Sequence, residues 1–165
     1  AAVASAGDWD GDGVLDTAIG APDSNAEATG GGAVWIVSGD VTGDAALVDV
    51  ASTSLTGRED GQAAGASLAP AGDINGDGFA DLLVGAPGAD GGRGAVLVVL
   101  GPVEGEASLG DVAYTELGEG ASDAAGTAVA GPGDVDGDGA DDILVGAPGA
   151  ASGGGSAYLY FGGGL

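Results

Sequence analysis

One acidic loop occurs three times in this sequence. The pattern Asp-x-Asp/Asn-x-Asp-Gly-x-x-Asp begins at Asp8, Asp73 and Asp134, and a Gly-Ala-Pro tripeptide follows each copy at the same distance. Two motifs that recur together mark a repeat architecture, which limits the fold to one small unit used three times. The predicted repeats cover residues 1–57, 58–118 and 119–165, with approximate boundaries.

Each repeat reads as short strands separated by glycine-rich turns. Blocks of small and branched apolar residues, such as 81–85 and 95–100, alternate with turns. The proline of Gly-Ala-Pro ends its block because proline cannot donate to a strand ladder. No segment keeps a helical period of apolar residues, and the 38 glycines disfavour long helices. We therefore predict an all-β chain.

The second and third strand blocks are apolar on both faces, as in residues 82–84 and 96–100. Strands of this kind are covered on both sides, whereas a sandwich exposes one face of each sheet and shows clearer alternation. Small antiparallel sheets stacked face to face around an axis meet this requirement. We expect β-propeller blades of four antiparallel strands, in three repeats.

The acidic loop presents oxygen ligands at alternate positions. Calcium takes about 6–8 hard oxygen ligands in flexible geometry, and the glycine at the sixth position permits a sharp bend. The seventh position carries no suitable side chain, so we assign its main-chain carbonyl. The ninth aspartate is expected to close the cage through both oxygens. We predict three Ca²⁺ ions, one per repeat, held by Asp8, Asp10, Asp12, Val14 and Asp16; by Asp73, Asn75, Asp77, Phe79 and Asp81; and by Asp134, Asp136, Asp138, Ala140 and Asp142.

Other interpretations of the loops fit less well. Ordinary Asp-Gly turns would hold mutually repelling carboxylates without any gain. Magnesium prefers rigid octahedral geometry, and oxygen-only ligands disfavour zinc and copper. An EF-hand needs a glutamate at the twelfth position between helices, but Ile19, Val84 and Val145 stand there, within strand blocks.

The composition excludes several functions. Only Arg58 and Arg93 oppose 26 acidic residues, so the formal net charge is −24. We expect no nucleic-acid partner because phosphate binding needs cationic side chains, and no membrane insertion because no apolar block is long enough to span a bilayer. The absence of cysteine and histidine excludes disulfides, a Ser-His-Asp triad and zinc sites built on those residues.

On these motifs the chain resembles the FG-GAP repeat, the blade unit of the integrin alpha-subunit propeller and of many secreted bacterial proteins. Gly-Ala-Pro occurs three times, the Phe-Gly element stands at Phe161-Gly162, and Ser38-Gly39 and Leu100-Gly101 take its place in the other repeats. The resemblance implies calcium at the loop between the first two strands and an extracellular or cell-surface location. Family propellers have seven blades, so we expect this segment to belong to a larger closed ring. Neighbouring blades or copies of the chain would complete that ring.

The leading functional hypothesis is a secreted, non-catalytic adhesion or ligand-binding module for a protein or glycan ligand. Two alternatives are an accessory carbohydrate-binding propeller of a secreted enzyme and an architectural protomer of a surface assembly. An aspartate pair can hydrolyse glycans, but a bound cation would keep nearly all these carboxylates ionised, so we predict no enzyme activity. Trp9 and Trp35 could stack on a sugar, although packing is the commoner use of tryptophan.

Overall fold

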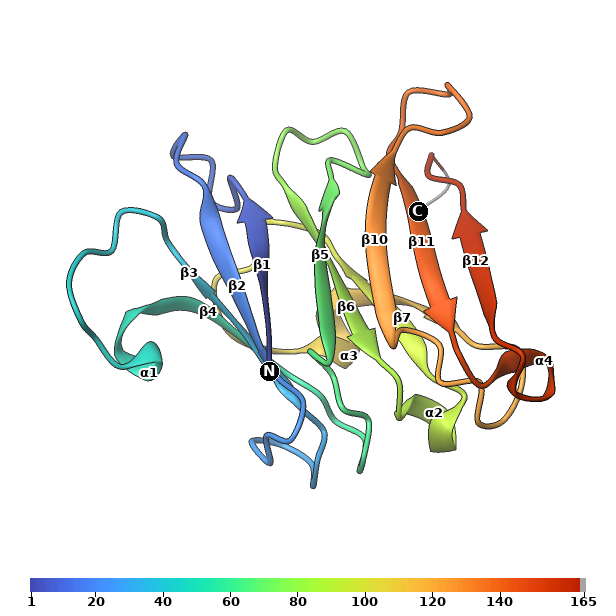
Figure 1. Ribbon diagram of the computed structural model, residues 1–165. Coiled ribbons are helices and arrows are strands. Elements are labelled where there is room, and N and C mark those ends of the chain that lie inside the picture. Colours follow the sequence, from blue (N-terminus) through green and yellow to red (C-terminus); the bar gives the residue numbers. More distant parts are fainter. Residues whose placement is uncertain (164–165) are drawn as a thin grey trace.

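The protein, described by a computed structural model over residues 1–163, is built almost entirely of short strands (Figure 1). Three sheets fan out from a row of first strands, and each sheet is one blade. Blade 1 contains β1 (Ala2–Gly7), β2 (Asp16–Ala21), β3 (Ala33–Val37) and β4 (Ala51–Thr56). Blade 2 contains β5 (Ser67–Gly72), β6 (Asp81–Ala86), β7 (Ala95–Val99) and β9 (Ala113–Leu117), and blade 3 contains β10 (Ala128–Gly133), β11 (Asp142–Ala147) and β12 (Ser156–Tyr160).

Helical structure is confined to single turns. In the described part of the chain these turns are α1 (Leu47–Val50), α2 (Ala89–Gly92), α3 (Leu109–Val112) and α4 (Ala150–Gly153). None of them is long and apolar enough to cross a membrane.

The strands of each blade follow one another in antiparallel order, which confirms the predicted blade topology. Among the described residues blade 3 contains three strands, of which β12 is the last. Blade 1 differs from the prediction in gaining a fifth strand, β8 (Gly105–Ser108), which pairs in parallel with β4. β8 therefore pairs with the outer edge of β4. Sheet proteins generally protect such edges, because an unpaired strand edge can pair with another chain.

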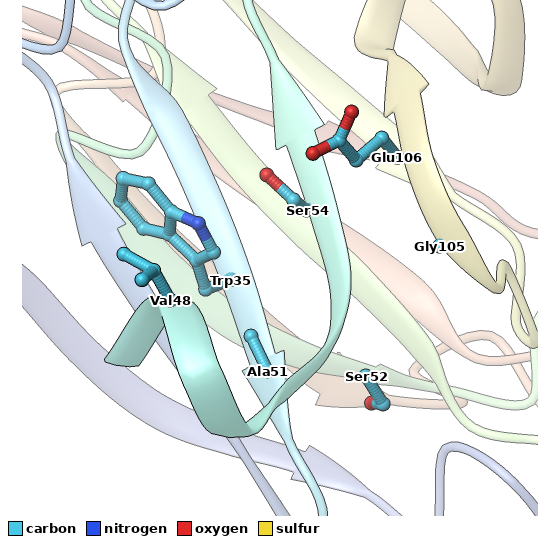
Figure 2. Close-up of a pocket in the computed structure, with 7 residues that line it drawn as sticks. All are labelled: Trp35, Val48, Ala51, Ser52, Ser54, Gly105 and Glu106. Atoms are coloured by element: carbon cyan, nitrogen blue, oxygen red, sulfur yellow. The ribbon is translucent and has the colours of Figure 1, made fainter. Parts of the chain in front are cut away.

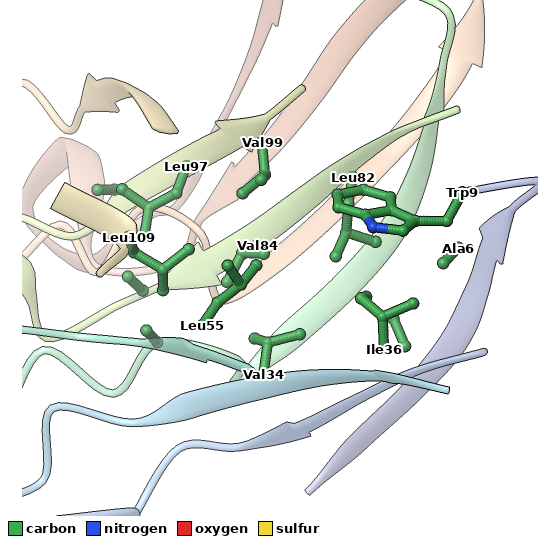
Figure 3. Packing of buried hydrophobic residues seen from close by; sticks show 14 of the residues in the cluster. Ala6, Trp9, Val34, Ile36, Leu55, Leu82, Val84, Leu97, Val99 and Leu109 are labelled. Atoms are coloured by element: carbon green, nitrogen blue, oxygen red, sulfur yellow. The ribbon is translucent and has the colours of Figure 1, made fainter. Parts of the chain in front are cut away.

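The blades pack face to face, and β5 lies between β1 and β10 at the centre (Figure 1). Leu82 and Val84 of β6 point into the core between blades 1 and 2, opposite Val34 of β3 (Figure 3). Leu83 points the other way, into the core that blade 2 shares with Ile143 of blade 3. Every residue of β6 and β7 is buried, as the two-sided apolar pattern predicts. Each such leucine or valine contributes about 1.5–3 kcal/mol by leaving water.

The glycine of Gly-Ala-Pro lets adjacent blades approach closely. A Cβ atom at Gly20 would collide with the carbonyl oxygen of Gly65, and one at Gly85 would collide with the carbonyl oxygen of Gly126. In blade 3, which has no following blade in this chain, a Cβ atom at Gly146 would meet its nearest neighbour at an ordinary 3.5 Å. The motif therefore serves blade-to-blade packing as well as ending a strand.

Blades 1 and 3 each have one open face. Leu144 and Leu159 are partly exposed on blade 3, although their counterparts on blade 2, Leu83 and Val98, are fully buried against blade 3. On blade 1, Ile19 and Trp35 are half-buried at positions where blade 2 carries the buried Val84 and Leu97. Both open faces thus carry side chains of the kind that the inner faces bury.

Replacing the packing glycine of blade 2 tests this account. We expect Gly85→Ala to lower the free energy of unfolding by about 1–3 kcal/mol, because the added methyl group forces blades 2 and 3 apart. The matched variant Gly146→Ala should change it by less than about 0.5 kcal/mol. Urea denaturation of the two variants and the wild type measures both effects, and equal losses would contradict the packing argument.

Candidate calcium-binding loops

The three acidic loops lie at the same end of the molecule (Figure 1). Loop 1 (8–16), loop 2 (73–81) and loop 3 (134–142) each join the first and second strands of a blade. In every blade the strand register shifts just before the loop, at Gly7, Gly72 and Gly133. The repeat thus places three acidic hairpin loops side by side in space.

Backbone amides turn the carboxylates inward. The first aspartate of each loop accepts a hydrogen bond from the glycine at the sixth position, with N–O distances of 3.1 Å in loop 1 and 2.9 Å in loops 2 and 3. The side chains at the third and fifth positions each accept from the amide two residues further on. Examples are Asp12 N–H to Asp10 Oδ1 at 3.1 Å and Val14 N–H to Asp12 Oδ1 at 2.7 Å.

The aspartate at the ninth position is buried and held at both oxygens. Asp81 Oδ2 accepts the N–H of Ile74 at 2.7 Å, and its Oδ1 accepts the N–H of Gly101 at 2.9 Å. Asp16 and Asp142 repeat these two bonds, with Trp9 and Gly39 in blade 1 and with Val135 and Gly162 in blade 3. The glycine of the Phe-Gly element therefore donates to the ninth aspartate, a role that the sequence did not reveal.

That glycine is also required sterically. A Cβ atom at Gly39, Gly101 or Gly162 would collide with the carbonyl oxygen at the eighth loop position of the same blade, which belongs to Leu15, Ala80 or Asp141. The end of the third strand and the acidic loop are therefore fixed against each other.

Carboxylate oxygens converge in two of the loops. Oxygens of Asp8, Asp10 and Asp16 lie within 4.8 Å of one another, and so do oxygens of Asp134, Asp136 and Asp138. Asp12 and Asp142 lie outside these two groups. In loop 2, Asn75 stands where the other loops have an aspartate; its Nδ2 donates to Asp77 Oδ2 at 2.8 Å and its Oδ1 accepts from Asp77 N–H at 3.0 Å.

Asp8 gives the clearest indication that loop 1 is a cation site. Its Oδ1 is buried and has no hydrogen-bond donor among the described residues. A buried carboxylate oxygen without a partner is costly, and a cation among Asp8, Asp10 and Asp16 would satisfy it. The donor set, made only of carboxylate, amide and carbonyl oxygens, suits Ca²⁺.

Two aspartates of the loops have raised pKa values, chiefly through desolvation and further through neighbouring carboxylates. The pKa of Asp10 is raised by desolvation, with further contributions from the neighbouring carboxylates Asp12, Asp16 and Asp8. Burial likewise raises the pKa of Asp81, partly offset by the N–H groups of Gly101 and Ile74. Both shifts make the ionised form less favourable than in a free aspartate, and a bound cation would act in the opposite direction.

The remaining predicted site residues differ in their surroundings. Val14 is exposed, Phe79 and Ala140 are partly buried, and no partner of their carbonyl groups is identified in the structure, so this ligand role stays a prediction. Sequence reasoning missed the apolar residue at the second position: Trp9 and Ile74 are buried between blades. The signal in the sequence was an apolar residue between the first and third loop positions, which indicates a buried side chain within an otherwise polar loop.

The two tryptophans differ in accessibility. Trp9 is 1% exposed and donates through Nε1 to the carbonyl of Val103 at 3.2 Å, so it packs and does not face a ligand. Trp35 lies half-buried in a pocket with Ser54 and Glu106 (Figure 2). Only Trp35 remains a candidate for contact with a ligand.

Comparisons with known proteins agree with the resemblance drawn from the motifs. The model of the FG-GAP repeat matches residues 64–99 and 125–160. Similar proteins include "Integrin alpha pat-2" of Caenorhabditis briggsae, 48% identical over 86 residues that make up 50% of this chain and 7% of the relative. "Integrin alpha-PS5" of Drosophila melanogaster is 40% identical over 100 residues, 58% of this chain and 9% of the relative. Human "Integrin alpha-IIb" is 41% identical over 101 residues, 60% of this chain and 10% of the relative.

The chain therefore spans a tenth or less of the length of these relatives. The first repeat, which the family model does not cover, carries the same loop, the same Gly-Ala-Pro and the same blade topology as the two that it does. Matched repeats, strand order and integrin likeness agree: residues 64–99 and 125–160 are FG-GAP repeats, and the chain is similar to integrin alpha subunits.

Proposed function

We propose that this chain is a calcium-binding β-propeller module with a non-catalytic adhesion or ligand-binding role outside the cell. The observation that carries the calcium assignment is the buried, unpartnered Oδ1 of Asp8 in a loop that occurs three times. Each loop would bind one Ca²⁺ through the side chains at its first, third, fifth and ninth positions and the carbonyl at its seventh position. Bound calcium would neutralise carboxylates that otherwise repel one another.

Calcium in this proposal is mainly a structural ion. The ninth aspartate already ties its loop to the glycine that follows the third strand, as with Asp81 and Gly101. A cation held by the same carboxylate would connect the loop, β6 and the end of β7. Because a ligand that binds only the folded state stabilises it by mass action, calcium would raise the stability of all three blades.

The adhesion role rests on the integrin relatives. In β-propellers the loops that join the strands lie at the two ends of the blades, and ligand recognition usually occurs on such loops. Here the three acidic loops lie at the same end (Figure 1). We place the module outside the cell, facing a protein or glycan ligand. The second candidate, an accessory carbohydrate-binding propeller, is favoured by the half-buried Trp35 beside Ser54 and Glu106 (Figure 2), since an indole can stack on a sugar ring.

Partners of a second kind would cover the open blade faces. The exposed Leu144 and Leu159 of blade 3 match residues that are buried between blades elsewhere, so the partner that fits is another blade of the same type. It would come from neighbouring repeats or from a second copy of the chain. Stacking of this head-to-tail kind closes into a ring or continues as a filament.

Removal of calcium is the direct test of the proposal. At about 100 times its dissociation constant, one calcium ion adds about 2.7 kcal/mol to the free energy of unfolding. We expect a chelator to lower the Tm by on the order of 10 °C or more, because three sites are emptied together. Differential scanning calorimetry with and without calcium measures the shift, and isothermal titration of the apo protein should count three sites. Identical melting curves would refute the calcium assignment.

Removing one negative charge from loop 1 separates the effect of carboxylate repulsion on stability from the effect of calcium binding. Asp10→Asn copies the residue that loop 2 has at this position, where Asn75 keeps the equivalent hydrogen bond. The variant removes a carboxylate whose pKa is raised by desolvation and by the neighbouring carboxylates, so without calcium its Tm should equal or exceed that of the wild type. With calcium its Tm should fall below the wild type. Asp44→Asn, at an exposed site outside the loops, is the control. If calcium raised the Tm of Asp10→Asn as much as it raises the Tm of the wild type, the ligand role of Asp10 would be contradicted.

The open faces generate a prediction about assembly. We expect sedimentation velocity to show concentration-dependent self-association in calcium, because each open face would leave water on contact with another blade. Leu144→Glu and Leu159→Glu should weaken it by placing charge on the buried side of the contact. Tyr114→Glu, at an exposed position on the outermost strand of blade 2, is the matched control. A strictly monomeric chain at millimolar concentration would exclude the second-copy partner.

A further inference from the structure

Loop 1 is in direct contact with loop 2. The Phe79 ring lies over Gly11, so that a Cβ atom at Gly11 would come within 2.8 Å of Cε1 of the ring. The N–H of Ala80 donates to the carbonyl oxygen of Asp8 at 3.4 Å, and the Ala80 methyl group lies against Gly7. Residues at the seventh and eighth positions of loop 2 therefore touch both the start and the middle of loop 1.

Loop 1 is also anchored on blade 2 through Trp9. This residue stands between the predicted ligands Asp8 and Asp10, and its N–H donates to Asp16 Oδ2 at 2.7 Å. Its ring is buried in the core between blades 1 and 2, near Leu82 (Figure 3), and its Nε1 donates to the carbonyl of Val103, which lies in the connection between β7 and β8. The backbone that carries the loop 1 ligands is thus held in place by blade 2.

The ring contact between loops 1 and 2 is not repeated between loops 2 and 3, although Asp141 at the eighth position of loop 3 lies against Gly72 as Ala80 lies against Gly7. Gly76 is the counterpart of Gly11, and a Cβ atom there would meet open space, because Ala140 replaces Phe79 at the seventh position. The second-position residues of loops 1 and 2, Trp9 and Ile74, are 1% and 4% exposed, whereas Val135 of loop 3 is 56% exposed. The contact of an aromatic ring with a loop glycine therefore joins loops 1 and 2 and has no counterpart between loops 2 and 3.

We propose that Phe79 is a positioning residue of the first calcium site, although it belongs to the second loop, and that these two sites therefore fill cooperatively. The inference rests on the proposed calcium function. The carbonyl of Phe79 is the predicted seventh-position ligand in loop 2, so calcium there fixes the backbone that holds the Phe79 ring on Gly11. Loop 1 then has less disorder to lose when its own ion binds. Because coupling free energy is reciprocal, calcium in loop 1 favours loop 2 equally.

Site-resolved calcium titration by NMR tests this coupling in the intact chain. The glycine amides at the sixth loop positions, Gly13, Gly78 and Gly139, each donate to the first aspartate of their own loop and so report separately on the three sites. The probe is calcium chloride, added to ¹⁵N-labelled apo protein. In Phe79→Ala, the midpoint of the Gly13 signal should move to about fivefold higher calcium, and the Gly139 midpoint should stay unchanged.

Tyr114→Ala is the control variant. It removes an exposed aromatic side chain of blade 2 that lies outside the loops, and it should leave all three midpoints at wild-type values. Phe79→Leu keeps an apolar group near Gly11 and should recover most of the Gly13 affinity. These variants separate a positioning role from a general loss of stability.

Each outcome decides a different point. If no glycine signal responds to calcium, the proposed calcium function is wrong. If all three sites respond but Gly13 has the same midpoint in Phe79→Ala as in the wild type, the coupling is wrong and the calcium function stands. An equal shift of all three midpoints would also overturn the inference, since it would show that Phe79 supports the fold as a whole.

Discussion

The buried aspartate that closes each loop is the interaction on which the rest of the molecule depends. In blade 2, Asp81 receives two backbone N–H groups, one from the start of the loop and one from the residues after the third strand. Burial raises the pKa of Asp81, and the nearby carboxylates add to this shift, so the ionised form is less favourable there than in a free aspartate. The same residue therefore fixes the hairpin geometry and, under the proposed function, would bind the cation.

Packing between blades follows from equally local requirements. Gly85 brings blades 2 and 3 together at their backbones, and Leu83 and Val98 then fill the space between them. With so few large residues available, close approach takes the place of bulky side chains. The only two basic residues contribute little, since the Arg58–Asp111 and Arg93–Asp90 pairs lie at the surface, where exposed ion pairs are weak.

Much of this arrangement could be predicted from the sequence because it is encoded locally. The spacing of the Asp-Gly motif located the loops, and the two-sided apolar blocks around Leu83 and Val98 predicted stacked sheets. The parallel addition of β8 to blade 1 could not be predicted, since Gly105 to Ser108 carries no strand pattern and pairs with a distant segment. Packing was the favoured use of Trp9, but its place between blades 1 and 2 could not be predicted, because the spacing of ligands says nothing of where the residues between them point.

Each of the first two loops connects its own blade to the next blade in the sequence. Trp9 reaches from loop 1 into blade 2, and Ile74 reaches from loop 2 into the core shared with blade 3. A repeat protein whose units contact only their neighbours draws its cooperativity from such interfaces. Because the residues that enter each interface stand between predicted calcium ligands, the order of a loop and the docking of the next blade depend on each other. The acidic loops thus connect neighbouring blades, and if they bind calcium as proposed, the ion would stabilise these connections as well as the loops.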